Sequence, residues 1–211
     1  DLTPLREHPK WIVGFSDVTM LHMALGQLGI ESLHATMPGK FRFGADEKPE
    51  AIVSDESLRS ALFGRWTRID AAAHPLNVSG TARGRLAGGN LSLLCSAIGT
   101  PEQPDFDTPT VLFIEEIGEQ MYRLDRMMQQ LERSGILAKC KAVLVGHFTD
   151  MLGQKHFGIW DPCDIIAAYV RPLGIPVVFG IPAGHEDPNV ALYMGREVAV
   201  TVNDAGASVE F

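Results

Sequence analysis

Three side chains in this sequence could together carry out nucleophilic catalysis: Ser16, Glu115 and His185. A serine hydroxyl is a poor nucleophile until a base removes its proton, and a neighbouring histidine commonly acts as that base. An acid that orients the histidine completes a catalytic triad, and the chain order here is nucleophile, acid, base. We therefore interpret Ser16 as a candidate nucleophile, Glu115 as the orienting acid and His185 as the general base of a hydrolase.

Ser16 lies in the stretch Gly14-Phe15-Ser16-Asp17, between an apolar run and an apolar helical pattern. A sharp turn from strand to helix exposes a serine Oγ and directs free backbone N–H groups at a developing oxyanion. The usual motif for such a turn is Gly-x-Ser-x-Gly, but Val18 occupies its last position here. An ordinary serine at the start of a helix is the alternative interpretation.

Glu115 and His185 both follow apolar runs that are typical of buried strands. Glu115 comes directly after residues 111–114, and His185 ends the glycine- and proline-containing stretch at residues 180–185. Ligand sites in open α/β sheets collect beyond the carboxyl ends of strands. The alternatives are a solvated group of acids for Glu115, Glu116 and Glu119, and a structural role for His185.

Composition excludes several classes of function. The chain has 211 residues, with 26 acidic and 18 basic side chains, and its net charge of −8 comes without a Lys/Arg run. Binding to nucleic acid or to an anionic membrane needs clustered positive charge, so neither partner is expected. No apolar run approaches the length of a membrane span, about 20 residues. The three cysteines lack CxxC spacing, which argues against a disulfide framework or a zinc site and favours a reducing, cytoplasmic location.

The periodicity predicts alternating strands and helices. Strands are expected at residues 11–15, 110–114, 142–145 and 175–179, and helices at 18–28, 54–63, 91–98, 120–132 and 162–170. Asp17 is expected to cap the first of these helices. Residues 198–202 and 207–211 read as a closing hairpin. This alternation predicts an α/β fold with a largely parallel sheet.

The predicted elements also suggest a division of the chain. Residues 67–84 lack a helical period and contain several glycines and a proline, so we interpret them as strand and loop and as the linker between two domains. Residues 1–66 would then form the part that carries Ser16, and residues 85–211 the part that carries the acid and the base. No metal ligand set with suitable spacing is present, and no metal or organic cofactor is expected.

Four stretches resemble the LD-carboxypeptidase family of serine peptidases, which includes murein tetrapeptide carboxypeptidases and microcin immunity peptidases. They are Ile12 with Val13-Gly14-Phe15-Ser16-Asp17-Val18-Thr19; Gly88-Gly89-Asn90-Leu91 with Gly99-Thr100-Pro101; residues 112–119 with 122–127; and residues 180–185. The resemblance implies Ser16 as nucleophile, Glu115 as acid and His185 as base. It also implies a two-domain α/β fold with the site between the domains, and it makes a homodimer plausible.

The resemblance carries further expectations. The family's Arg-Gly-Gly-Tyr-Gly stretch, whose glycine N–H helps to form the oxyanion hole, is absent from this sequence. The N-terminal domain is therefore expected to be incomplete, with the backbone N–H of Asp17 as the remaining oxyanion donor. The implied activity releases a terminal D-amino acid from a murein tetrapeptide. The alternatives are an immunity peptidase that cleaves an aminoacyl-nucleotide antibiotic and a non-catalytic binding domain.

Overall fold

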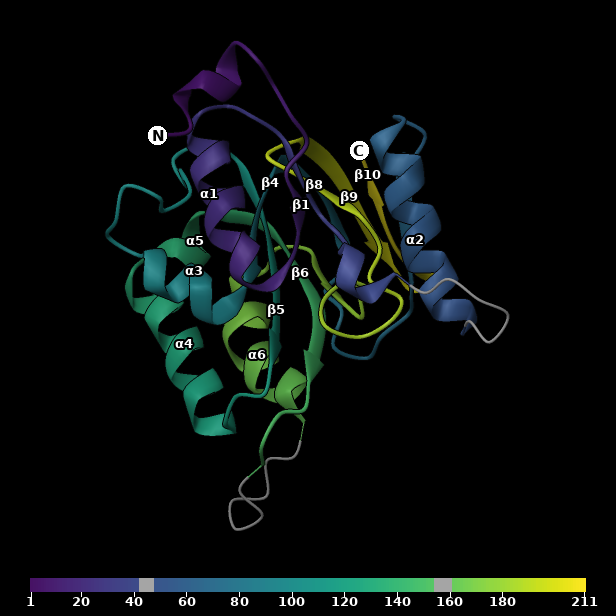
Figure 1. Ribbon diagram of the computed structural model, residues 1–211. Coiled ribbons are helices and arrows are strands. Elements are labelled where there is room, and N and C mark those ends of the chain that lie inside the picture. Colours follow the sequence, from purple (N-terminus) through teal and green to yellow (C-terminus); the bar gives the residue numbers. More distant parts are fainter. Residues whose placement is uncertain (42–47, 154–160) are drawn as a thin grey trace.

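The computed structural model describes residues 1–41, 48–153 and 161–211, which form two β-sheets with helices packed against them (Figure 1). The helices are η1 (Thr3–Arg6), η2 (Ser16–Val18), α1 (Thr19–Gln27), η3 (Pro38–Lys40), α2 (Pro49–Leu62), α3 (Leu91–Ala97), α4 (Met121–Arg133), α5 (Ile136–Lys139), α6 (Pro162–Val170) and η5 (Arg171–Leu173), where η marks a 3₁₀-helix. The strands are β1 (Val13–Gly14), β2 (Ser32–His34), β3 (Arg68–Ala72), β4 (Gly80–Asn90), β5 (Thr110–Ile117), β6 (Cys140–Thr149), β7 (Val177–Phe179), β8 (Leu192–Met194), β9 (Glu197–Asn203) and β10 (Gly206–Glu210).

The larger sheet has the strand order β3-β10-β9-β4-β5-β6-β7. Strands β4 to β7 are parallel, as the alternating pattern predicted, whereas β3, β10 and β9 add an antiparallel half. The predicted hairpin is confirmed, because β9 and β10 pair antiparallel across a short turn. Helices α3, α4 and α6 cover one face of the parallel half (Figure 1). The carboxyl ends of β4, β5 and β6 therefore meet at one edge of the sheet.

Both faces of the parallel half are buried. Leu112 and Ile114 of β5 pack among the helices, while Val111 and Phe113 pack into a second core with residues of β8, β9 and β10. A strand covered on both sides reads as a continuous apolar run rather than as an alternating one. This explains why the sequence pattern predicted β5 and β6 well.

The smaller sheet has the order β1-β2-β8, with β1 parallel to β2 and β8 antiparallel to it. Strand β8 lies close to the C-terminus in sequence, so the two ends of the chain build one sheet. Helix α2 packs against this sheet through a third core that includes Leu33, Leu58 and Tyr193. This arrangement places the turn after β1 beside the larger sheet.

The interpretation of residues 67–84 as strand and loop is confirmed, and their role as a joint between two domains stays a prediction. The segment contains β3 and the first half of β4, which pair with β10 and β9 of the larger sheet. Gly84 lies inside β4, where an added Cβ would stand 2.8 Å from the Pro109 carbonyl oxygen. A glycine can lie inside a strand where another backbone approaches closely, and not only in a loop.

Three smaller expectations also need correction. The first strand is shorter than predicted, because only residues 13 and 14 pair within it. The second helix begins at Pro49 rather than at residue 54, since a proline in the first turn starts a helix well. Asp17 does not cap α1; it lies within η2, and the side chain at the start of α1 makes no capping hydrogen bond.

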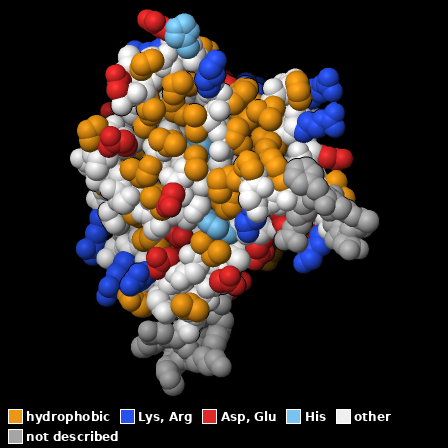
Figure 2. Space-filling model, viewed as in Figure 1, with side chains coloured by type: hydrophobic (Ala, Val, Ile, Leu, Met, Phe, Trp, Pro, Cys, Tyr) orange, Lys and Arg blue, Asp and Glu red, His pale blue; other side chains and the backbone are white. Residues whose placement is uncertain are grey.

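Apolar side chains gather over the upper half of the face shown in Figure 2. The large apolar side chains that the structure leaves exposed include Trp11, Leu21 and Phe63, of which Phe63 is 70% exposed. Within the described ranges, no helix is both long and apolar enough to cross a membrane.

Candidate active site

Ser16 lies at the junction of β1 and η2, on the strand-to-helix turn that the sequence predicts. Its φ of 60° places it in the left-handed region, which a non-glycine residue occupies at a cost of about 1–3 kcal/mol. Gly14, just before the turn, has a φ of 159°, and a Cβ there would stand 2.7 Å from Val18 Cγ2. The turn is therefore tight, strained and glycine-dependent, as in enzymes that expose a nucleophile.

His22 of α1 fastens this turn to the smaller sheet. Its Nε2 is 2.9 Å from the Gly14 carbonyl oxygen and its Nδ1 is 2.8 Å from Ser32 Oγ. Since a carbonyl only accepts, Nε2–H donates, and Nδ1 of the neutral ring accepts from the serine hydroxyl. Burial lowers the pKa of His22 to about 4, so the ring stays neutral at pH 7. The local sequence around His22 gives no signal for these two hydrogen bonds.

Glu115 and His185, which are 70 residues apart, form a hydrogen-bonded pair. His185 Nδ1 lies 2.7 Å from Glu115 Oε2, and the Glu115 side chain is fully buried. Because a carboxylate accepts, the imidazole proton sits on Nδ1, which leaves Nε2 free to accept a proton. Burial raises the pKa of Glu115, and the hydrogen bond from His185 opposes that rise.

The neighbouring acid, Glu116, points to the other face of the sheet. Its carboxylate accepts hydrogen bonds from Asn90 Nδ2 and from the backbone N–H of Ser92, each at 2.8 Å. It thereby binds the first turn of α3 to the end of β5. Successive side chains of a strand alternate between faces, so the two acids cannot both reach His185.

A β-bulge shapes the edge of the sheet beside Glu115. Ile114 pairs with Val145 and Glu116 pairs with Phe148, so the single residue Glu115 stands opposite Gly146 and His147. Bulges near active sites re-aim side chains. An added Cβ at Gly146 would lie 2.4 Å from the Ala183 carbonyl oxygen, so glycine is needed where the chain before His185 passes β6.

Helix α2 holds the loop that follows His185. The backbone N–H of Asn189 donates to Ser54 Oγ at 2.8 Å, and Ser54 Oγ donates to Asp187 Oδ1 at 3.1 Å. Asn189 Oδ1 in turn accepts from the backbone N–H of Gly184 at 3.0 Å. These contacts fix the loop on both sides of His185, and sequence periodicity gave no signal for them.

Phe15 brings the two halves of the candidate site together. Its ring meets the His185 ring edge-on, with the centroids 4.9 Å apart and an angle of 76° between the planes. Ser16 is the next residue in the chain. No hydrogen bond joins Ser16 Oγ to His185 Nε2 in the described residues, which is common where a catalytic contact tightens only on substrate binding.

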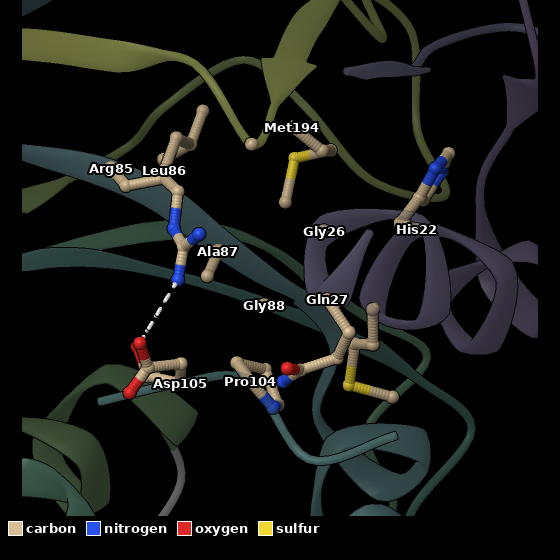
Figure 3. Close-up of a pocket in the computed structure, with 12 residues that line it drawn as sticks. His22, Gly26, Gln27, Arg85, Leu86, Ala87, Gly88, Pro104, Asp105 and Met194 are labelled. Carbon is tan, nitrogen blue, oxygen red and sulfur yellow. Dashed lines mark hydrogen bonds and ion pairs between the residues drawn. The ribbon is translucent and has the colours of Figure 1, made fainter. Parts of the chain in front are cut away.

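A separate pocket is lined by residues of α1 and by Arg85 and Asp105, whose side chains form an ion pair at 3.8 Å (Figure 3). Its cavity of about 20 Å³ has room for a single water. None of Ser16, Glu115 and His185 lines it. Across the described ranges, no group of three or more His, Cys, Asp or Glu side chains is arranged to hold a metal ion.

An α/β fold with a serine on a strained turn near a histidine–carboxylate pair resembles the arrangement that serine hydrolases use. Residues 83–200 match the C-terminal domain of the LD-carboxypeptidases, and residues 1–35 match their N-terminal domain. The chain belongs to the LD-carboxypeptidase family.

Similar proteins carry related names. A Synechocystis sp. protein named "Putative carboxypeptidase" is 35% identical over 96% of this chain, and a Bacillus subtilis "Probable murein peptide carboxypeptidase" is 33% identical over 100% of it. The chain spans 64% and 66%, respectively, of these two relatives. The crystal structure of muramoyltetrapeptide carboxypeptidase from Oxalobacter formigenes superimposes with a TM-score of 0.87 at 30% identity, covering 99% of this chain and 70% of that one. The expected fold class and family are thus confirmed.

Proposed function

We propose that the natural protein is a serine carboxypeptidase that hydrolyses an L–D peptide bond and releases a terminal D-amino acid from murein tetrapeptides. The observation that carries the proposal is the 2.7 Å hydrogen bond between His185 Nδ1 and Glu115 Oε2, next to the strained turn at Ser16. The names of the relatives support the substrate class. Because the chain spans about two thirds of those relatives, the proposal concerns the activity of the whole protein.

In the proposed mechanism, His185 Nε2 takes the proton of Ser16 while Oγ attacks the carbonyl of the L-residue. The backbone N–H of Asp17 donates to the oxyanion that forms. His185 then gives its proton to the amine of the departing D-amino acid, and a water molecule, deprotonated by the same nitrogen, hydrolyses the acyl-enzyme. Glu115 keeps the imidazole in the Nδ1–H tautomer and stabilises the imidazolium.

The test is steady-state kinetics of the natural protein on a disaccharide tetrapeptide, with mass detection of released D-alanine. Ser16→Ala and His185→Ala are each expected to lower kcat by about 10⁴-fold or more, and Glu115→Ala somewhat less. The triple variant should be little worse than Ser16→Ala, because the three groups act as one unit. Ser208→Ala in β10, three strands from β5, is the matched control and should keep full activity.

Several outcomes would contradict this function. Retained activity in Ser16→Ala, or abolition of wild-type activity by a chelator, would favour a metal-bound water over a serine nucleophile. Cleavage of an aminoacyl-nucleotide, but not of the tetrapeptide, would favour the immunity peptidase. A natural protein that binds either compound and hydrolyses neither would be a binding domain.

We also propose a cytoplasmic homodimer that acts on a small peptide and does not bind nucleic acid. The lack of CxxC spacing among the three cysteines supports the location, and the net charge of −8 supports the lack of nucleic-acid binding. Light scattering of the natural protein after gel filtration measures the oligomeric state, and a monomeric mass at micromolar concentration contradicts the dimer.

A further inference from the structure

The strained turn at Ser16 needs contacts on both sides to hold it in place. A residue in a sparsely populated region of φ/ψ space persists only where the surrounding structure fixes it, and Ser16 has a φ of 60°. His22 holds the side of the turn that precedes Ser16, through the Gly14 carbonyl oxygen. On the side that follows Ser16, the chain enters α1 at Thr19, which is fully buried.

Thr19 joins the start of α1 to the end of β4. Its Oγ1 accepts a hydrogen bond from the backbone N–H of Asn90 at 3.0 Å. The approach is close, because a Cβ added at Gly89 would stand 2.6 Å from Thr19 Oγ1 and 2.9 Å from Thr19 Cγ2. Gly89 also has a φ of 132°, a conformation that residues with a Cβ rarely adopt. The glycine before Asn90 therefore leaves the space that the Thr19 side chain occupies.

The contact between Thr19 and Asn90 lies next to the acid of the candidate site. Asn90 stands directly opposite Glu115 in the parallel pairing of β4 with β5. Helix α1 packs against β4 (Figure 1), whereas β1, which leads into the Ser16 turn, belongs to the smaller sheet. The candidate nucleophile and its acid thus come from different sheets, and the Thr19–Asn90 hydrogen bond links the elements that carry them.

We propose that Thr19 is a positioning residue for the nucleophile: by accepting from the Asn90 N–H, its hydroxyl fixes the Ser16 turn beside the acid–base pair. The part of this inference that concerns reactivity rests on the proposed function. Thr19 acts through the turn, because it sets the placement from which Ser16 Oγ meets His185 Nε2. Reactions between positioned groups are sensitive to placement, and a shift of about 1 Å can cost about 100-fold in rate.

Two substitutions at Thr19 separate the hydrogen bond from the packing. Thr19→Val keeps the shape of the side chain and removes the acceptor, whereas Thr19→Ser keeps the hydroxyl and removes the methyl group. The matched control is Thr110→Val, the same substitution at another fully buried threonine. Thr110 begins β5, at the end of the strand opposite Glu115, and its hydroxyl donates to the Thr108 carbonyl oxygen at 3.0 Å.

Amide hydrogen exchange of the natural protein, measured by NMR, tests the turn without substrate. The Val18 N–H donates to the Phe15 carbonyl oxygen, so its exchange reports opening of the turn. In Thr19→Val, we expect the Asn90 and Val18 amides to exchange at least about tenfold faster, because a buried donor that has lost its acceptor favours local opening. Thr19→Ser and Thr110→Val should leave both amides slow.

Two results of this measurement overturn the proposal. The first is exchange at Val18 that is no faster in Thr19→Val than in Thr110→Val. The second needs no variant that might fail to fold: a freely exchanging Asn90 amide in the unsubstituted protein shows that its hydrogen bond to Thr19 is not formed.

The reactivity of Ser16 is measured with a fluorophosphonate, a reagent that labels activated serines without recognising a peptide. Ser16 Oγ bonds to phosphorus, fluoride leaves, and His185 takes the serine proton. We expect the labelling rate, followed by mass spectrometry, to fall by about 10- to 100-fold in Thr19→Val. Thr19→Ser and Thr110→Val should label at close to the unsubstituted rate. An unchanged rate in Thr19→Val overturns the positioning role.

Steady-state kinetics on the tetrapeptide separate this inference from the proposed function. Thr19→Val should lower kcat by a similar factor and leave KM little changed, because the substitution moves the nucleophile and removes no substrate contact. Thr19→Ser should keep the unsubstituted kcat. If the unsubstituted protein neither labels nor hydrolyses the tetrapeptide, the proposed function fails, and hydrogen exchange still decides whether Thr19 holds the Ser16 turn.

Discussion

At the scale of single residues, the adjacent acids Glu115 and Glu116 show how one strand end serves two purposes. Glu115 pairs with His185 on one face, and Glu116 binds the start of α3 on the other. Both faces of β5 are covered, so both carboxylates are buried and each needs its own donors. The chemistry of the candidate site and the placement of α3 thus depend on consecutive residues.

The sequence could identify this pair of acids but could not distinguish their roles. A carboxylate after an apolar strand predicts a position at the sheet edge, and the family resemblance favoured Glu115. Which face each side chain meets depends on what covers that face, and those contacts come from residues 24 or more positions away. For the same reason, no local pattern pointed to His22 as the residue that fastens the Ser16 turn.

Glu116→Ala should reduce stability through the loss of a shared acceptor. The variant leaves Asn90 Nδ2 and the Ser92 N–H without their partner, and an unsatisfied buried donor costs about 1–3 kcal/mol. Urea unfolding measures the change. The control is Glu119→Ala, which removes an exposed ion pair to Arg123 and should cost at most about 1 kcal/mol. Equal losses in the two variants would contradict the structural role of Glu116.

At the scale of elements, the Ser16 turn depends on how α1 is fastened to β1 and β2. The neutral His22 ring spans the Gly14 carbonyl and the Ser32 hydroxyl, so helix and sheet are held together at the point where the nucleophile would sit. Protonation would turn Nδ1 into a donor, so Nδ1 could no longer accept the hydrogen bond from the Ser32 hydroxyl. The fastening is therefore sensitive to acid.

This sensitivity predicts a pH-dependent stability. The folded-state pKa of His22 is about 4 against 6.5 for the free side chain, so the unfolded state binds the extra proton first as the pH falls. The stabilisation is fully present above pH 6.5 and is lost as the pH falls toward 4. Between pH 7 and pH 4, the free energy of unfolding should fall by about 3 kcal/mol more in the wild type than in His22→Gln. Urea unfolding at each pH measures these free energies, and an equal change in the two proteins would contradict the prediction.

Gly146 and Gly26 differ in whether their surroundings leave room for a side chain. Gly146→Ala places a methyl group 2.4 Å from the Ala183 carbonyl oxygen and 2.8 Å from Phe113 Cε2, so the segment before His185 must shift. We expect a loss of about 1–3 kcal/mol and a lower kcat. Gly26→Ala, in α1, meets nothing within 4 Å and should gain about 1 kcal/mol from helix propensity. Thermal unfolding measures both, and a stabilised Gly146→Ala would refute the close approach at the bulge.

At the scale of the whole molecule, the first and last parts of the chain are interlocked. β8 pairs with β2, and Tyr193 at its centre donates to the Ala61 carbonyl oxygen at 2.9 Å. Trp66 Nε1 donates to the Ala191 carbonyl oxygen at 2.9 Å. The loop after His185 is held by α2 in the same way. The orientation of the acid–base pair toward Ser16 therefore depends on contacts between segments far apart in sequence.

Local periodicity predicted the helices of the central sheet and its parallel strands because each buries its own apolar face. It could not predict β8 as a partner of β2, since a three-residue strand carries little pattern and its partner lies about 160 residues away. It predicted strand and loop for residues 67–84 but could not predict that these strands pair with β10 and β9. The division into residues 1–66 and 85–211 stays a prediction, although the strands between them belong to the larger sheet.

The interlocking predicts that the chain unfolds in one cooperative transition. Removing residues 85–211 from contact with α2 and β2 would expose the core formed by Leu33, Leu58 and Tyr193, so neither part can open while the other stays intact. In urea, near-ultraviolet and far-ultraviolet circular dichroism should give the same midpoint. A fragment of residues 85–211 expressed alone should lack this transition, because β8 has lost its only partner strand in the described structure. Two separate midpoints, or a fragment that unfolds like the whole chain, would show instead that the two parts are independent and that the candidate site lies at a movable boundary.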